Sequence, residues 1–289
     1  MKSWKGMPME GNILSIIEDK YESFSKTNKQ LANYIREHAN TAAFLSIKEM
    51  EAVSGVSVAS ISRFVKEIGC QGYADFQKHL AGMLLKNVTP MQEIKDSITR
   101  HSEGGTLKTL IEANQRTLAF LYSEDLQKNF DATIERVKNL HGKLYITASR
   151  SSFCVAYFLH FMLKGFMPNV ELLVDDHNDI SNRLLYVTPE DMLIAISYSR
   201  YTRISYELAS FFRELGCCVV SVSDSDQSPI ALCSNFVLLG KNIDGAYGFA
   251  GAMTLANCLV TALGQIDGEQ TLQQMKRQDA IAVAQNLYL

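Results

Sequence analysis

Two short segments of the chain combine hydroxyl side chains with an arginine, which suits them to hold an anion. The first reads Thr147-Ala-Ser-Arg-Ser-Ser152 and the second reads Ser197-Tyr-Ser-Arg-Tyr-Thr202. Each follows an apolar run and precedes a stretch of helical periodicity. At a helix N-terminus, hydroxyls can donate to phosphate oxygens, the helix dipole favours negative charge, and an arginine adds positive charge. The residues predicted to bind a ligand here are Ser149, Arg150, Ser151, Ser197, Ser199, Arg200 and Thr202.

These segments also have a plainer explanation, because Ser and Thr are preferred as ordinary helix caps. Their positions decide between the two explanations. Both segments follow strands predicted to lie in one sheet, and ligands of open α/β sheets bind at the carboxyl ends of the strands. Two hydroxyl-rich segments at corresponding strand ends favour an anion site over simple capping.

A second pattern lies nearer the N-terminus, where residues 45–69 predict two short helices joined by a turn that contains Gly55. Ser46 and Glu49 are spaced as a capping box for the first helix. Its predicted apolar stripe is Ile47, Met50 and Val53. Ser57 is the predicted N-cap of the second helix, and Gly69 stands where that helix stops.

The second helix has two contrasting faces. Its predicted buried face holds Ile61, Phe64, Val65 and Ile68, whereas Ala59, Ser62, Arg63 and Lys66 share the opposite face. Small side chains let a helix enter the DNA major groove, while Arg and Lys can reach base edges or phosphates. An ordinary helical hairpin with a solvated outer face is the alternative. The predicted DNA contacts are Ser57, Ala59, Ser60, Ser62, Arg63 and Lys66.

The elements that must position these residues fall into two predicted domains. Residues 1–86 are expected to be all-helical, with Thr27 and Gln30 as a capping box that opens a second helix. Residues 87–105 are polar, contain Pro90 and a Gly-Gly pair, and are the predicted linker. From residue 106 to residue 289 a helix over 107–122, with a continuation towards 137, precedes alternating strands and helices.

The predicted strands are short and almost continuously apolar. They lie at residues 144–147, 170–174, 192–197, 218–222 and 236–239, with helical stretches such as 153–164, 202–215 and 250–263 among or after them. This alternation predicts a three-layer α/β domain whose five-stranded parallel sheet is covered on both faces.

Composition limits the class of protein. The chain has 289 residues, 47% of them hydrophobic and 20% charged, and contains no apolar run long enough for a transmembrane helix and no secretory signal, so a cytoplasmic protein is expected. Residues 1–88 carry 11 Lys/Arg and 9 Asp/Glu, a balance of +2, whereas residues 89–289 carry 17 and 22, a balance of −5. A mildly basic head on an acidic body fits a modest DNA-binding domain, for which dimerisation would double the phosphate contacts.

Metal and disulfide chemistry are not indicated. The six cysteines show no CxxC pair and no zinc-finger spacing. The segment Asp175-Asp-His-Asn-Asp179 superficially resembles a metal cluster, but adjacent side chains point in different directions and a solvated loop is the favoured interpretation. We therefore expect no metal site, no cofactor and no catalytic residues.

Residues 45–81, including Ser-Ile-Ser-Arg-Phe and Gly-Tyr-Ala-Asp-Phe-Gln-Lys-His-Leu-Ala, resemble the N-terminal domain of the RpiR family of bacterial transcriptional regulators. From about residue 106 the chain resembles that family's sugar isomerase (SIS) domain, most closely in Ile196-Ser-Tyr-Ser and Ser228-Pro-Ile-Ala. The resemblance implies an oligomeric regulator whose SIS domain senses a phosphorylated sugar. It also implies that His177 lies near the ligand. Asp244 lies near the position at which SIS isomerases carry an acidic catalytic group.

The chain departs from the family at both ligand loops. The first loop of the family usually reads Gly-x-Gly-x-Ser and here reads Thr147-Ala-Ser-Arg-Ser151, while the second usually reads Ser-x-Ser-Gly-x-Thr and here has Arg200 in place of glycine. Such glycines let a backbone turn tightly and approach a phosphate. The hydroxyls of Ser151, Ser197, Ser199 and Thr202 survive. A retained but altered anion site is favoured over a pocket that no longer binds sugar phosphate.

Together these observations predict a DNA-binding regulator of carbohydrate metabolism rather than an enzyme. Its expected partners are double-stranded operator DNA, a phosphorylated sugar or related anionic effector, and further copies of itself in a homodimer or homotetramer, with no membrane partner. One rival is a sugar-phosphate isomerase with an appended helical domain, which the altered loops and the lack of a paired acid and base oppose. The other is a regulator whose SIS domain serves only for dimerisation.

Overall fold

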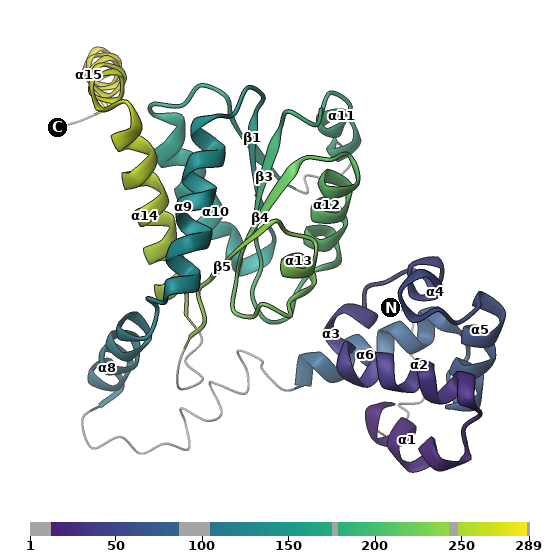
Figure 1. Cartoon of the computed structure of the whole chain (residues 1–289). Coiled ribbons are helices and arrows are strands. Elements are labelled where there is room, and N and C mark those ends of the chain that lie inside the picture. The colour runs from purple at the N-terminus through teal and green to yellow at the C-terminus, as the bar shows by residue number, and fades with distance from the viewer. Residues whose placement is uncertain (1–12, 87–104, 175–178, 243–247, 288–289) are drawn as a thin grey trace, which may run out of the picture. The chain divides into compact units, whose positions relative to one another are not determined.

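The computed structural model describes residues 13–86, 105–174, 179–242 and 248–287. The chain divides into two compact units, Met1–Thr89 and Pro90–Leu289, which are described separately (Figure 1). Of the predicted linker, residues 87–104 lie outside the described residues, and Gly105 is the first residue of a helix.

The first unit is helical, as predicted. Its elements are α1 (Ile13–Lys20), the 3-10 helix η1 (Tyr21–Ser23), α2 (Lys26–Glu37), α3 (Ala39–Ala42), α4 (Ile47–Ser54), α5 (Val58–Glu67) and α6 (Tyr73–Lys86). Its core includes Ile17, Leu31, Met50, Phe64 and Phe76, each fully buried. The rings of Phe24 and Phe64 lie 5.2 Å apart and join the start of α2 to α5.

Two local predictions in this unit are wrong. Helix α2 begins at Lys26 because the Ser25 side chain accepts a hydrogen bond from the Asn28 N–H at 3.2 Å, so Ser25 rather than Thr27 is the N-cap. Val53 is 49% exposed and does not belong to the buried stripe of α4. Helix α4 has only eight residues, and its last turn directs Ser54, not Val53, towards the core.

The second unit is a three-layer α/β domain with a five-stranded parallel sheet, as predicted. The strands are β1 (Leu144–Ala148), β2 (Val170–Leu173), β3 (Met192–Ile196), β4 (Cys218–Ser223) and β5 (Phe236–Leu239), each within one residue of its predicted ends. Their order is β2-β1-β3-β4-β5. The helices are α8 (Gly105–Ala119), α9 (Glu124–Lys138), α10 (Phe153–Lys164), α11 (Ile180–Leu184), α12 (Arg203–Glu214), α13 (Pro229–Leu232), α14 (Ala250–Ile266) and α15 (Gly268–Ala284), with the 3-10 helix η2 at Arg150–Ser152.

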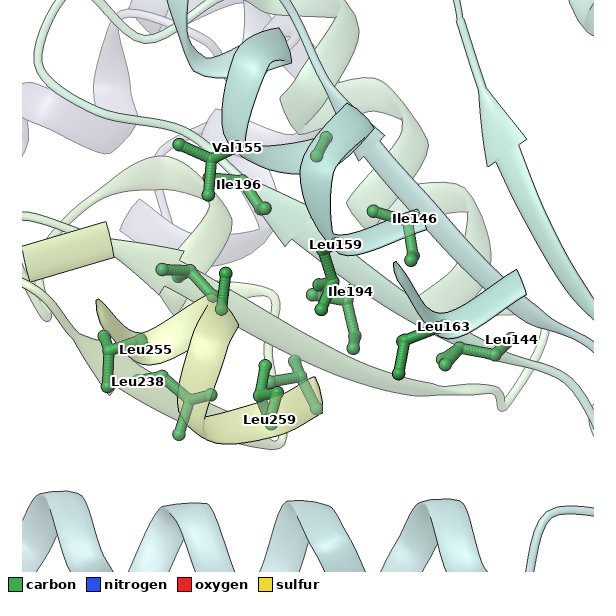
Figure 2. Close-up of a cluster of buried hydrophobic side chains, with 14 of the residues drawn as sticks. Leu144, Ile146, Val155, Leu159, Leu163, Ile194, Ile196, Leu238, Leu255 and Leu259 are labelled. Atoms are coloured by element: carbon green, nitrogen blue, oxygen red, sulfur yellow. The ribbon is translucent and has the colours of Figure 1, made fainter. Parts of the chain in front are cut away.

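Helices cover both faces of the sheet, which explains why the strands lack polar alternation. Helices α9, α10 and α14 lie on one face, and α12 and α13 lie on the other (Figure 1). In Figure 2, Ile146 and Ile194 of the strands meet Leu159 of α10, with Leu259 of α14 in the same cluster. Tyr145 and Leu193, one residue along each strand, belong to the core on the opposite face.

The helix predicted over residues 107–122, with its continuation towards 137, is two helices. Helix α8 ends at Ala119, and α9 begins after Ser123. The side chain of Ser123 accepts a hydrogen bond from the Leu126 N–H at 3.1 Å, which caps α9. Both helices place apolar residues at helical spacing, so the hydrophobic periodicity of the sequence continues across the break. Only the N-cap residue marks the boundary between α8 and α9.

A close approach beside the sheet requires a glycine at position 240. The Tyr198 hydroxyl donates to the Gly240 carbonyl oxygen at 2.9 Å, and Tyr198 is buried. A Cβ at position 240 would overlap that hydroxyl and lie 3.1 Å from the Leu255 Cδ1. Close packing therefore requires glycine at this position. The Tyr198 hydrogen bond then holds the residues after β3 against the end of β5.

We expect Gly240→Ala to lower the free energy of unfolding by about 1–3 kcal/mol, the usual penalty for overpacking a buried site. Gly268→Ala is the matched control, since its added Cβ would meet nothing within 4 Å. Chemical denaturation of the full-length variants measures both. Equal stability of the two variants would show that the Tyr198 contact relaxes without penalty.

Candidate functional site

Helix α5 is held at its start by two caps. The Ser57 side chain accepts a hydrogen bond from the Ser60 N–H at 3.4 Å, as predicted. The Glu51 carboxylate, reaching from α4, accepts the Val58 N–H at 2.9 Å. Between the helices Gly55 adopts a left-handed φ of 68°, which turns the chain. The Glu51 contact joins the two helices and places a negative charge at the positive end of the α5 dipole.

The outer face of α5 carries the predicted DNA-contact residues. Ser57, Ala59, Arg63 and Lys66 are exposed, while Ser60 and Ser62 are half-buried. The opposite face buries Ile61, Phe64 and Val65 in the core. All six predicted positions thus lie on the solvent-facing side of α5 or at its N-cap, and their contact with DNA stays a prediction.

Arg63 lies along its own helix. Its Nε donates to the Ala59 carbonyl oxygen and its Nη2 donates to the Ser60 hydroxyl oxygen, both at 3.3 Å. These bonds are long and exposed, so exchanging them for a base or phosphate requires little free energy. The guanidinium is held near the N-terminal half of α5, the part of a recognition helix that contacts base edges.

In the second unit, the sheet topology brings the two predicted anion loops together. The strand order reverses at the junction of β1 and β3, which is where open α/β sheets bind ligands. Ala148 pairs with Ile196 at the ends of these strands. The first loop (residues 149–152) and the second loop (residues 197–202) therefore leave neighbouring strands at the same edge.

Hydroxyl contacts join the two loops through α12. The Ser205 hydroxyl in the first turn of α12 lies 2.9 Å from the Thr202 hydroxyl and donates to the Ser149 hydroxyl oxygen at 3.5 Å. Ser197 is buried, and its N–H donates to the Val222 carbonyl oxygen at 3.1 Å. Ser149 and Thr202 thus both contact Ser205, whereas the Ser197 N–H is bonded to the sheet. Ligand binding by these residues stays a prediction.

Ser199 donates two hydrogen bonds to a carboxylate of the protein itself, that of Asp224. Its N–H donates to the Asp224 carboxylate at 3.0 Å, and its hydroxyl donates to the same carboxylate oxygen. The Tyr201 hydroxyl donates to the other Asp224 oxygen at 2.9 Å. Burial, and then the Asp224 charge, raise the pKa of Tyr201, so that this phenol stays protonated and able to donate.

The two loop arginines share an unusual backbone conformation. Arg150 has a φ of 55° and Arg200 a φ of 73°, both in the left-handed region, and both residues are exposed. A non-glycine residue there carries about 1–2 kcal/mol of strain. Of the three positions where the family resemblance expects glycine, 147 is strand residue Thr147, and Ser149 is extended at φ −127°. Only Arg200 keeps a conformation that favours glycine.

The remaining predictions concern Ser151, two residues that the structure does not describe, and metal binding. Ser151 is exposed within η2, and its carbonyl oxygen accepts from the Cys154 thiol at 3.0 Å. His177 and Asp244 lie outside the described residues, so the structure does not place them. Among the residues that are described, no group of three or more His, Cys, Asp or Glu side chains could hold a metal ion. Asp224, Tyr201 and Ser205 were missed, although Asp224 directly follows a strand as the predicted loops do.

Across the described parts of the chain, no helix has both the length and the apolar character needed to cross a membrane.

Two family models match the chain in separate regions. A helix-turn-helix domain of the rpiR family matches residues 11–87, and a SIS domain matches residues 139–263. An uncharacterized HTH-type transcriptional regulator of Caldanaerobacter subterraneus is 25% identical over 249 residues, which are 84% of each chain. The HTH-type transcriptional regulator HexR of Escherichia coli is 26% identical over 226 residues, 76% of this chain and 74% of HexR.

Solved structures share the fold. The Vibrio vulnificus NanR protein complexed with ManNAc-6P has a TM-score of 0.58 at 21% identity, covering 94% of this chain and 98% of NanR. The sugar isomerase domain of an RpiR transcription factor from Sphaerobacter thermophilus has a TM-score of 0.52 at 20% identity, covering 60% of this chain and 96% of that domain.

We expect Glu51→Ala to lower the free energy of unfolding of the helical unit by about 1 kcal/mol, because the Val58 N–H loses its charged acceptor. Glu37→Ala, at the exposed end of α2, removes the same charge without touching α5 and should change stability much less. Chemical denaturation followed by helical circular dichroism measures both. A Glu51 variant as stable as the Glu37 variant would show that this cap does not stabilise α5.

Proposed function

We propose that this chain, which belongs to the rpiR family of helix-turn-helix proteins with a SIS domain, is a DNA-binding transcriptional regulator of carbohydrate metabolism. The observation that carries this proposal is the outer face of α5, which presents Ala59, Ser62, Arg63 and Lys66 to solvent above a fully apolar inner face. Small, polar and basic residues without a carboxylate among them suit a helix that enters a major groove. A regulator of this kind acts on the chromosome, in the cytoplasm.

The SIS domain is the proposed sensor. The junction of β1 and β3 gathers two hydroxyl-rich loops with an exposed arginine on each, which suits a phosphorylated sugar or a related anion. NanR, which shares the fold, was solved with ManNAc-6P, and this supports a phosphosugar as the class of effector. The proposed ligand contacts are Ser149, Arg150, Ser151, Ser197, Ser199, Arg200, Thr202 and, by family resemblance, His177.

We do not propose an enzyme. The named relatives are transcriptional regulators, and an aldose–ketose isomerisation needs a base and an acid poised on the substrate. Among the described residues, the Asp224 carboxylate lies at the candidate site, where it accepts hydrogen bonds from Ser199 and Tyr201. A regulator whose SIS domain only dimerises is the second candidate, favoured by the arginine at position 200.

Effector binding would control DNA binding by changing the placement of paired helical units. Two copies of α5 would read a pseudo-palindromic operator whose half-sites are a whole number of helical turns apart. A ligand shifts such an equilibrium only by as much as its affinity differs between the two arrangements. The proposed assembly is therefore a homodimer or homotetramer.

Arg63→Ala should weaken binding to a selected operator by about 1–3 kcal/mol if Arg63 reads a base, while binding to random duplex DNA changes little. Lys26→Ala removes one exposed charge from the start of α2 and serves as the charge-matched control. Fluorescence anisotropy at fixed salt measures both affinities. Unchanged operator binding by the Arg63 variant would exclude this residue from the contacts.

Titration of the full-length protein with N-acetylmannosamine 6-phosphate and glucose 6-phosphate tests the sensor. We expect saturable binding of a phosphosugar and none of the matching neutral sugar, and a change in operator affinity on saturation. Arg200→Gln should weaken that binding by about threefold to tenfold, as expected for an exposed charge-assisted contact. Arg213→Gln, exposed near the other end of α12, is the control. Operator affinity indifferent to every phosphosugar would favour the dimerisation-only candidate.

A further inference from the structure

One carboxylate occupies the donors that a phosphate would use at the second loop. Asp224 accepts the Ser199 N–H at 3.0 Å and the Ser199 hydroxyl on one oxygen, and the Tyr201 hydroxyl at 2.9 Å on the other. A backbone N–H and two hydroxyls converging on an anion are the kind of group that binds phosphate oxygens. Here they converge on the protein's own side chain.

The backbone that carries Asp224 is held firmly. Ser223, the last residue of β4, is buried, and its hydroxyl lies 2.8 Å from both the Ser197 carbonyl oxygen and the Ser228 hydroxyl oxygen. Ser228 caps α13 by accepting the Ala231 N–H. Asp224 therefore leaves a fixed strand end directly beside the second loop, and only its side chain can swing away.

A phosphate and the Asp224 carboxylate cannot share these donors. Both are anions, and like charges within a few ångström repel strongly where solvent is partly excluded. A phosphate that took the Ser199 N–H and hydroxyl would have to displace the carboxylate. Each hydrogen bond that the effector gains at these donors then replaces one that the free protein already makes, so the net gain is small.

We propose that Asp224 is an internal competitor for the phosphate group of the effector, and that displacing its carboxylate from the second loop sets the affinity of the sensor. This inference rests on the proposed sensing function of the SIS domain. It makes Asp224 a specificity-determining residue, because a weakly charged ligand displaces a carboxylate less readily than a phosphate dianion does.

The competing account makes Asp224 a positioning residue that holds the second loop ready for the ligand. The two accounts predict opposite signs. Removing a competitor frees three donors and tightens phosphate binding, whereas removing a support loosens the loop and weakens it.

The test is calorimetric titration of the full-length protein with inorganic phosphate and with N-acetylmannosamine 6-phosphate at constant ionic strength. We expect Asp224→Ala and Asp224→Asn to bind phosphate at least about tenfold more tightly than the natural chain, as follows from freeing charge-assisted donors. Asp226→Asn, an exposed carboxylate on the same turn, removes the same charge without those contacts and should change affinity by less than about twofold.

A second comparison tests whether the competition runs through Ser199. In a Ser199→Ala background the gain from Asp224→Ala should shrink, because one shared donor is gone and the two substitutions are coupled. Thermal unfolding verifies that each variant is folded, and Asp224→Asn, which preserves the side-chain volume, replaces the alanine variant if that variant unfolds.

The outcomes separate the inference from the proposed function. Phosphosugar binding by the natural chain with equal or weaker binding by both Asp224 variants overturns the inference and leaves the sensor intact. Binding by the variants alone supports the competitor and removes the sensing role of the natural chain. No binding by any variant overturns both.

Discussion

The pairing of β1 with β3 is the constraint on which the candidate sensor depends. Because Ala148 stands opposite Ile196, the residues that follow each strand emerge side by side, and the strand order diverges outward from this junction. Close packing on both faces holds that register, since a shift of one residue would exchange the two sets of core side chains. The loop chemistry is thus set by packing several residues away from any ligand.

The donors that we propose for recognition also make hydrogen bonds within the fold. In the free protein the second loop satisfies its hydrogen bonds through Asp224, while Thr202 and Ser149 meet through Ser205. The helical unit is similar, because Arg63 donates hydrogen bonds to the Ala59 carbonyl oxygen and the Ser60 hydroxyl oxygen of its own helix. In both units several of the polar groups proposed to recognise a partner are paired within the fold, so binding would exchange one set of contacts for another.

The sequence predicted the elements better than the contacts. Nearly continuous apolar runs located the five strands of the described residues, because a strand in a sheet covered on both faces has no polar alternation. The outer face of α5 followed from helical spacing. The sequence offers two hydroxyl residues close together that could cap α2, and spacing alone did not choose between them. Thr27 was therefore predicted as the N-cap in place of Ser25. Asp224 was missed because it contacts Ser199, which lies 25 residues away in the chain, in the loop after the neighbouring strand, and only the strand order reveals that the two are close.

The Tyr198 contact with Gly240 has a consequence for motion. Tyr198 is anchored in the core at one end of the second loop, and Thr202 precedes the first turn of α12 at the other. Opening of the loop is therefore a local fluctuation of the residues between them, of the kind that occurs well below the global free energy of unfolding. Amide exchange at residues 199–201 would proceed without exchange in β3 or β4, and the domain could respond to its surroundings on a timescale independent of its folding stability.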